Sequence, residues 1–336
     1  MNKAGILNNS TIDPNKILPM RYPWAREYYK TGVNNNWVPE EVPMMDDIEL
    51  WKKSPERGGL TPEERRMILW NLGFFSTAES LTANNIVLAV YRHVTNPECR
   101  QYLLRQAFEE AIHTDMFIYC SDSLGLDPDE IYSMYESVPS IKAKDDFVIG
   151  MTSSIMDPNF KTDTTENIQK FIHDLFGYYV IMEGVFFYAG FAMMLQLLRQ
   201  QKMVGIGEQF QYTLRDESVH LAFGSDLINT IVQENSEVWT DSFKQDLADK
   251  MKVAVDLEDA YAQDCLPRGI MGMNAEIIRQ YLEHIADRRL ERIGLEKIYG
   301  ATNPFPWMSE IMDLKKEKNF FETRVTEYQT AGNLDW

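Results

Sequence analysis

The hydrophobic pattern along most of this chain predicts helices, and no region is rich in strand signals. One start is marked by Leu60-Thr-Pro-Glu-Glu64, where Thr61 serves as N-cap, Pro62 as the first helical residue and Glu64 as the partner in a capping box. Helices are predicted over residues 61–94, 96–124, 142–154, 162–201, 205–235, 241–264 and 274–293, with a shorter one opening at residues 125–129. We therefore expect an all-α protein.

Residues 178–198 are apolar on every side of the predicted helix, and Glu183 is their only charged residue. Such a stretch is nearly long enough to span a membrane. An ionisable residue inside a membrane helix is costly, however, and no second segment of this kind occurs. We therefore predict the centre of a large helical bundle rather than a membrane span.

A repeated motif carries the chemistry. Glu110-x-x-His113 recurs as Glu217-x-x-His220, and residues three apart share one face of a helix. With 51 acidic residues and five His in 336 positions, about one such pair is expected by chance. Each copy points one carboxylate and one imidazole at the same place, so two facing helices would supply four ligands to one site.

Two further carboxylates, Glu79 and Glu183, lie inside apolar helical stretches. A buried carboxylate must be protonated, paired or bound to a cation. The order is then a Glu followed by Glu-x-x-His, used twice, which is the known pattern of ferritin-like dimetal carboxylate bundles. Four carboxylates and two imidazoles suit iron and manganese, and two divalent ions would neutralise the four Glu. The predicted metal ligands are Glu79, Glu110, His113, Glu183, Glu217 and His220.

Composition narrows the class of protein further. The net charge of −18 argues against a nucleic-acid partner, which would call for a basic face. Cys99, Cys120 and Cys265 are too few and too scattered for a disulfide framework or a zinc site. The first residues lack the apolar core of a secretory signal, so we expect a cytoplasmic protein without a membrane segment.

Three regions are predicted along the chain. Pro14, Pro19, Pro23, Pro39 and Pro43 suggest that residues 1–55 are irregular, while three Trp suggest that this segment packs on the body. Residues 56–313 form a ferritin-like helical domain with extra helices around its core. Residues 314–336 are mostly polar and form a flexible C-terminal tail that ends in Leu334 and Trp336.

Almost the whole chain resembles the small, radical-generating subunit of class I ribonucleotide reductase. The likeness lies in the six ligands, the Arg215–His220 run, Trp37-Val-Pro-Glu-Glu-Val42 and the tail around Tyr328. It implies a dimetal centre that activates oxygen and stores a one-electron oxidant, which generates a thiyl radical in a large subunit for reduction of ribonucleotides. It also implies that the tail binds this large (alpha) subunit, and a homodimer is expected.

Two departures from the family pattern narrow the expectation. The first ligand is Glu79 where most members have Asp, and Phe117 stands where most have the Tyr that stores a radical. A phenyl ring has no phenolic hydrogen to lose. Both features resemble the subclass with a manganese/iron cofactor, and an iron/iron or manganese/manganese centre remains open.

The family's electron path implies radical transfer through His113, Asp216, Trp37 and Tyr328. Taken alone, Trp37 would be read as ordinary packing and Tyr328 as a solvated tail residue. Tyr212 and Tyr119 are further candidates for accessory redox work, equally compatible with core packing.

Three other functions use some of the same features. A stand-alone dimetal oxidase or oxygenase would share the ligands but would have no need of Trp37 or the Tyr328 tail. A ferroxidase or storage bundle is usually far shorter. A metal-free scaffold would bind no metal at all.

Overall fold

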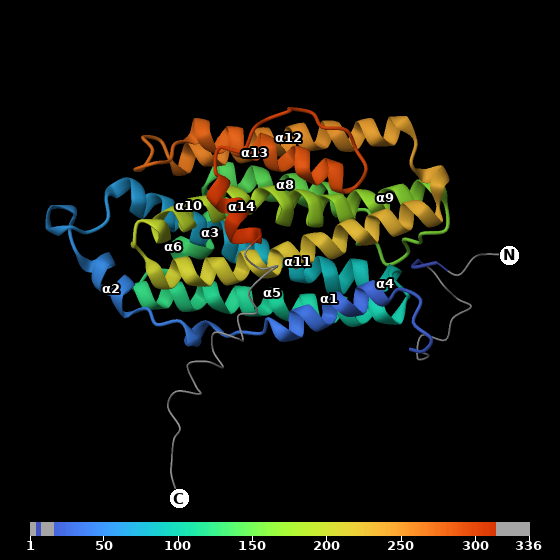
Figure 1. Cartoon of the computed structure of the whole chain (residues 1–336), viewed down its shortest axis with the longest axis horizontal. Coiled ribbons are helices and arrows are strands. Elements are labelled where there is room, and N and C mark those ends of the chain that lie inside the picture. The colour runs from blue at the N-terminus through green and yellow to red at the C-terminus, as the bar shows by residue number, and fades with distance from the viewer. Residues whose placement is uncertain (1–4, 8–16, 314–336) are drawn as a thin grey trace, which may run out of the picture.

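The computed structural model describes residues 5–7 and 17–313, and within these ranges the chain is helical almost throughout. No strand forms there, apart from two isolated bridge pairs. The predicted all-α, ferritin-like class is confirmed (Figure 1). The helices that carry the clustered Glu and His residues are α3 (Pro62–Asn85), α5 (Pro97–Leu124), the π-helical segment η4 (Phe176–Phe186) and α11 (Val204–Glu234).

The remaining helices extend or cover this core. Around the core run α3's continuations η3 (Ile86–Val90) and α4 (Tyr91–His93), then α6 (Pro128–Tyr132), α7 (Met134–Ser137), α8 (Pro139–Thr152), α12 (Asp241–Cys265) and α13 (Ala275–Arg292). Short helices η1 (Pro39–Glu41), η2 (Pro55–Arg57), η5 (Ser236–Val238) and α14 (Pro306–Asp313) lie in the connections and near the C-terminal end.

Local sequence explains where the long core helices begin. Thr61 accepts a hydrogen bond from the backbone N–H of Glu64, whose side chain accepts one from the N–H of Thr61, so the predicted capping box is present. Asn96 caps α5 in a similar way, with Pro97 as the first helical residue. The α5 helix ends at Gly125, whose φ of 67° suits glycine.

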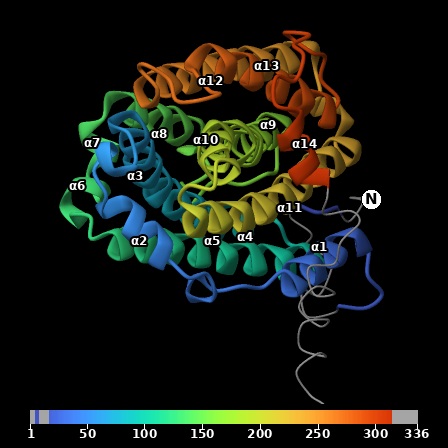
Figure 2. The ribbon, with the colours of Figure 1, turned by 60° about the vertical axis from the view of Figure 1, so that its left-hand side comes forward.

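The central element is the continuous run of α9 (Thr165–Leu175), η4 and α10 (Tyr188–Arg199). Figure 2 views this run nearly end-on, with α3 and α8, α5 and α11, and α12 and α13 around it. By length and composition it could cross a membrane, but its apolar window is 100% buried inside the bundle. The expectation of a bundle centre is therefore met, and a helix apolar all round needs such surroundings.

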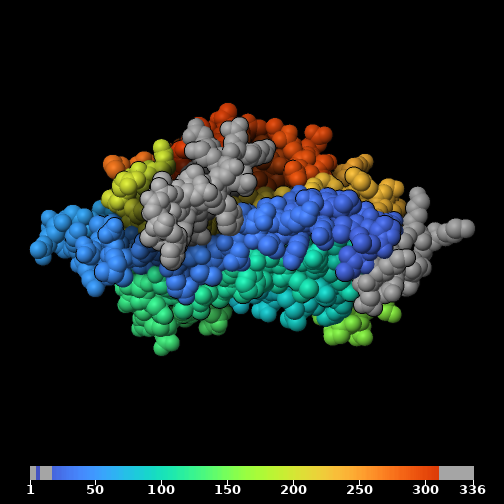
Figure 3. Space-filling model, turned by 60° about the horizontal axis from the view of Figure 1, so that its bottom comes forward, coloured from blue at the N-terminus to red at the C-terminus, as the bar shows by residue number. Residues whose placement is uncertain are grey.

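The N-terminal segment differs from the sequence prediction. The segment of residues 1–55, expected to be irregular, contains α1 (Pro23–Asn34) and α2 (Met45–Lys52). Pro23 begins α1 rather than breaking it, because proline is tolerated in the first helical turn. The described N-terminal part lies along one face (Figure 3), and Trp37 is buried. The three-region division itself stays a prediction, and residues 314–336 lie outside the described residues.

Candidate metal centre

The six predicted ligands converge in the middle of the bundle from four helical segments. All six side chains are fully buried. They form two groups that share one carboxylate: Glu79, Glu110, His113 and Glu217 in the first, and Glu110, Glu183 and His220 in the second. Within each group, one possible ligand atom from every residue lies within 4.8 Å of the others. Residues from positions 79 to 220 are thus folded into two adjoining groups of possible ligand atoms.

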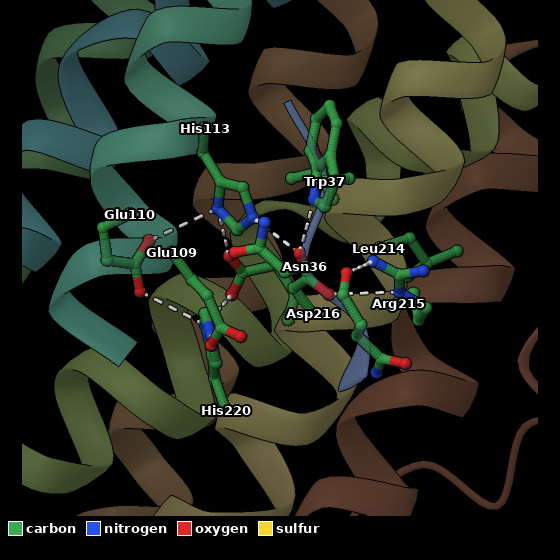
Figure 4. A network of polar contacts seen from close by, with 12 residues as sticks. Asn36, Trp37, Glu109, Glu110, His113, Leu214, Arg215, Asp216 and His220 are labelled. Carbon is green, nitrogen blue, oxygen red and sulfur yellow. Dashed lines mark hydrogen bonds and ion pairs between the residues drawn. The ribbon is translucent and has the colours of Figure 1, made fainter. Parts of the chain in front are cut away.

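The two imidazoles face the carboxylates with the same ring nitrogen. The Nδ1 atom of His113 lies 3.1 Å from Glu217 Oε1, 3.3 Å from Glu79 Oε2 and 3.5 Å from Glu110 Oε2. The Nδ1 atom of His220 lies 3.2 Å from Glu110 Oε1 and 3.4 Å from Glu217 Oε2. Glu110 and Glu217 therefore each approach both imidazoles, one oxygen towards each, as bridging carboxylates do. Figure 4 shows His113 and His220 on either side of Glu110.

Within the described residues, several possible ligand atoms of this cluster have no hydrogen-bond partner of suitable geometry. They are Glu79 Oε1, Glu110 Oε2, Glu183 Oε2, both oxygens of Glu217, and His220 Nδ1. Buried polar atoms are normally paired, and an unpaired buried carboxylate is costly. The orphaned atoms all belong to residue types that bind iron and manganese, so the donor set fits a pair of such ions.

The electrostatics of the cluster favour bound positive charge. Burial raises the pKa of Glu79 and of Glu183 well above the usual range, and neighbouring carboxylates add to that rise. Burial pulls the pKa of His113 down, but the surrounding carboxylates, Glu79 foremost, together lift it well above the usual value. Four carboxylates against two imidazoles leave an anionic excess, which protons or metal cations must offset.

Each imidazole turns its second nitrogen to a carboxylate of the opposite helix. His113 Nε2 lies 3.4 Å from Asp216 Oδ2, and this same oxygen accepts a hydrogen bond of 2.8 Å from the indole N–H of Trp37. His220 Nε2 lies 2.9 Å from Glu109 Oε2. The predicted association of His113, Asp216 and Trp37 is therefore present in the structure (Figure 4).

Gln106 closes the cluster on the side of Glu183. Its amide nitrogen donates to Glu183 Oε1 at 3.1 Å and reaches Glu110 Oε1 at 3.4 Å. Its amide oxygen accepts a hydrogen bond of 2.8 Å from the hydroxyl of Tyr179, which fixes the amide orientation.

Phe117 lies one helical turn beyond His113 and is fully buried. Its ring stacks on Phe75 at 5.4 Å between centroids and meets Phe210 edge-on at 5.6 Å. Two sides of the Phe117 ring, at the position where most family members have the radical-storing Tyr, are therefore covered by phenyl rings.

The other candidate redox residues have different surroundings. The ring of Tyr212 lies 5.2 Å from that of Trp37, and its hydroxyl donates to Glu208 at 2.7 Å. The hydroxyl of Tyr119 donates a hydrogen bond to the backbone carbonyl of Val42. This bond connects Tyr119 neither to the Glu and His cluster nor to Trp37. Tyr328 lies outside the described residues.

Comparison with known proteins decides the family. The sequence profile described as "Ribonucleotide reductase, small chain" matches residues 14–304. The chain belongs to the ribonucleotide reductase small-chain family. It is 59% identical over 336 residues to "Ribonucleoside-diphosphate reductase subunit beta" of Chlamydia pneumoniae, covering 100% of this chain and 96% of that one. A "Ribonucleoside-diphosphate reductase small chain" from vaccinia virus (strain Ankara) is 30% identical, covering 95% and 93%.

Solved structures agree with the small-chain assignment. The "Ribonucleotide reductase R2 subunit from Clostridium botulinum" superimposes with a TM-score of 0.80 at 28% identity, covering 92% of this chain and 94% of that one. The function is accordingly that of the beta subunit of a ribonucleoside-diphosphate reductase, an enzyme subunit that acts with a large subunit. The stand-alone oxidase and the scaffold are not supported by these likenesses.

Sequence reasoning missed four residues of the small chain's centre: Glu109, Arg105, Gln106 and Tyr179. Glu109 had a visible signal, because it precedes Glu110 as Asp216 precedes Glu217 in the second copy of the motif. Gln106 lies one turn before Glu110 on the same face. Arg105 and Tyr179 offered no comparable signal, since their contacts depend on how helices pack.

Proposed function

We propose that the six clustered residues bind a manganese/iron pair, and that this small chain keeps its oxidising equivalent on the metal pair rather than on a tyrosyl radical. The observation that carries the proposal is Phe117, buried against Phe75 and Phe210 where a radical-storing phenol would be needed. Bound there, the ions would react with dioxygen and supply the one-electron oxidant with which the large subunit forms its thiyl radical. Iron/iron and manganese/manganese centres are the alternatives to be tested.

In this proposal the residues of the chain divide the work. Glu79 and His113 would hold one ion, and Glu183 and His220 would hold the other. Glu110 and Glu217 would bridge the pair. Support comes from the oxygens of the bridging pair, which face both imidazoles at 3.1–3.5 Å. Four carboxylates would balance two divalent ions, so the occupied centre would be neutral in its reduced state.

Asp216 and Trp37 are proposed to carry the oxidant out of the bundle. Asp216 accepts hydrogen bonds from the indole of Trp37 and from Nε of Arg215, the latter at 3.1 Å. An indole losing an electron becomes acidic, and a carboxylate 2.8 Å away is placed to receive its proton. Tyr212, beside Trp37 and paired with the Glu208 carboxylate, is proposed as an accessory redox residue.

The large (alpha) subunit is proposed to bind through the tail of residues 314–336, with Tyr328 as the last residue of the path in this chain. Deleting residues from Leu314 onward should abolish ribonucleotide reduction with the large subunit and leave the metal content unchanged. A normal rate of deoxynucleotide formation by the truncated chain would show that the tail is not required.

A homodimer in the cytoplasm, without nucleic acid or membrane, completes the proposal. Its support is a set of exposed apolar side chains on two elements in contact: Leu104, Phe108 and Ile118 of α5, and Val87 and Leu88 of η3. Exposed apolar surface is typical of protein contacts. Sedimentation of the purified chain should give the mass of two copies, and Phe108→Glu should shift it towards one.

The metal proposal is tested by reconstituting the chain with iron alone, manganese alone and both, followed by assays with the large subunit and by EPR. Activity should follow combined manganese and iron loading and be poor with iron alone, and no tyrosyl signal should appear. A sharp tyrosyl signal that scales with activity in the iron-only sample would overturn the proposal. High activity with manganese alone would instead favour the manganese/manganese centre.

A further inference from the structure

The two halves of the cluster each have an outer carboxylate, but only one of these belongs to the proposed path of radical transfer. Asp216 serves His113 and also Trp37, whereas Glu109 serves His220. We propose that Glu109 is a positioning residue for the second metal site and orients His220 for metal binding. Arg105 holds the Glu109 carboxylate by a hydrogen bond, and Gly32 leaves the room that this carboxylate occupies. This inference rests on the proposed metal-binding function.

The geometry of Glu109 uses both of its oxygens. One oxygen lies 2.9 Å from His220 Nε2, and the other accepts a hydrogen bond of 3.0 Å from Arg105 Nε. The side chain is 2% exposed, so water contributes little to its solvation. A carboxylate held at both oxygens can take one orientation only, and that orientation sets the direction of the imidazole ring.

The contact also selects the tautomer of His220. A carboxylate accepts hydrogen bonds, so Glu109 favours the form with its proton on Nε2. The lone pair is then on Nδ1, which faces Glu110 and Glu217 and has no hydrogen-bond partner. A ligating imidazole needs this arrangement, and loss of such an outer carboxylate typically weakens metal binding 10- to 100-fold.

Gly32 provides an independent observation that the packing of α1 is fitted to Glu109. A Cβ atom at this position would lie 2.6 Å from Glu109 Oε1 and 3.0 Å from Cγ of Arg105. Carbon and oxygen do not approach so closely without displacement, so any larger residue would move the carboxylate or the helix. Glycine at position 32 thus leaves the room in which the Glu109–Arg105 pair lies.

Arg105 also connects this half of the cluster to the segment that carries Trp37. Its Nη1 donates to the side-chain oxygen of Asn36 at 3.0 Å, and Arg215 donates to the backbone carbonyl of Asn35. The residues just before Trp37 therefore contact the arginines of both outer carboxylates (Figure 4 labels Asn36, Trp37 and Arg215). Trp37 itself bonds only the Asp216 side, so Glu109 is assigned a positioning role and no part in the radical path.

The test measures Mn²⁺ binding directly, through the EPR signal of free Mn²⁺ during titration of the metal-depleted full-length chain. The wild-type chain should bind two ions. Glu109→Gln keeps the size of the side chain but makes the tautomer choice ambiguous, and should weaken one site 10- to 100-fold while leaving the other within threefold. Gly32→Ala, which retains every charge, should weaken the same site.

Matched controls separate this role from general packing. Glu98→Gln makes the same change at a buried Glu of α5, where the carboxylate accepts backbone hydrogen bonds from Arg21 and Tyr22. Gly150→Ala adds a methyl group where no atom lies within 4 Å. Both controls should keep two sites of wild-type affinity. The melting temperature of each metal-depleted variant reports any general loss of stability.

The outcomes distinguish the inference from the function on which it rests. If Glu109→Gln binds two Mn²⁺ ions with wild-type affinity while His220→Ala binds fewer, Glu109 has no positioning role but the metal assignment stands. Equal weakening of both sites, or the same loss in Glu98→Gln, would likewise overturn the inference. If the wild-type chain binds no Mn²⁺ pair, the proposed function and the inference fail together.

Discussion

Two clusters of charged side chains are fully buried in this bundle, and they are balanced in different ways. In one, Lys144 of α8 and Glu258 of α12 form an ion pair of 2.6 Å. The Lys144 ammonium also lies 3.3 Å from the centroid of the Phe74 ring and 3.8 Å from that of Tyr261. The other cluster is the candidate metal centre, where four carboxylates face two imidazoles and no Lys or Arg reaches the six ligands within the described residues.

A buried charge with a structural role is paired with an opposite charge of the protein, whereas the charges of a binding site are left for a ligand. Around the Lys144–Glu258 pair, one cation offsets one anion, and aromatic rings supply further favourable surroundings for the ammonium. At the candidate metal centre, Arg105 pairs with the outer carboxylate of Glu109, and Arg215 pairs with that of Asp216. The inner four Glu face two imidazoles and no Lys or Arg of the described residues, and this imbalance supports the proposed metal site.

The largest effect is expected from removing a bridging carboxylate. Glu110→Ala should reduce activity with the large subunit more than ~100-fold, because even outer-sphere partners of a metal ligand are worth 10- to 100-fold. The helical content should remain, since the change relieves repulsion within the cluster. Metal analysis and circular dichroism check both statements. Full metal occupancy in this variant would contradict the assignment.

The Lys144–Glu258 pair should behave in the opposite way. Lys144→Met leaves the Glu258 carboxylate buried without its cation and should cost about 3–5 kcal/mol of unfolding free energy, with metal content unchanged. The double variant Lys144→Met/Glu258→Met should recover most of this loss. Denaturant unfolding of metal-depleted protein measures both. A Lys144→Met variant that lost metal but kept its stability would remove the distinction between the clusters.

Glu183→Gln sharpens the comparison through pH. Because burial raises the pKa of Glu183 well above that of an unfolded carboxyl, the folded metal-depleted chain retains a proton that the unfolded chain releases. Stability is thus lost as pH rises above the unfolded pKa of about 4.3. Glu183→Gln should match the wild type at pH 4 and exceed it at pH 8, by about 1–2 kcal/mol. A variant less stable than the wild type at pH 8 would contradict this account, because the ionised Glu183 carboxylate would then stabilise the metal-depleted fold.

The smallest effect is expected at Asp145, a buried carboxylate outside both clusters. Neither oxygen has a hydrogen-bond partner within the described residues, and burial raises its pKa to about 7 despite the nearby Lys144. Its unfavourable contribution therefore grows from about pH 4 to pH 7 and is constant above that. Asp145→Asn should flatten this part of the stability profile, by about 1 kcal/mol, with no effect on metal content.

Much of the core followed from local sequence, because its determinants act over a few residues. Thr61 with Glu64 and Asn96 with Pro97 marked helix starts that the structure reproduces. The six clustered residues could be found because Glu-x-x-His occurs twice and because Glu79 and Glu183 stand out in apolar helices. The family likeness added Trp37 and Asp216, whose hydrogen bond joins residues 179 positions apart.

The rest depended on packing that no short stretch reveals. The π-helical segment Phe176–Phe186, which carries Glu183, departs from the α-helical repeat, and π-helical turns are frequent at functional sites. The contact of Glu109 with His220 requires α5 and α11 to meet in one register. Helix α1 was not predicted, because the prolines around it are typical of an irregular segment. Pro23 instead occupies the first position of the helix, where proline is tolerated.

Counting metal ions in the wild-type chain tests the centre most directly. Purified metal-depleted protein is loaded with manganese and iron together, freed of unbound ions by gel filtration, and analysed by inductively coupled plasma mass spectrometry beside His220→Ala. The two groups of possible ligands that share Glu110 predict two ions per wild-type chain and fewer in the variant, and the proposed function predicts one manganese and one iron. Less than one ion per wild-type chain, or equal metal in both proteins, would contradict a dimetal centre at these residues.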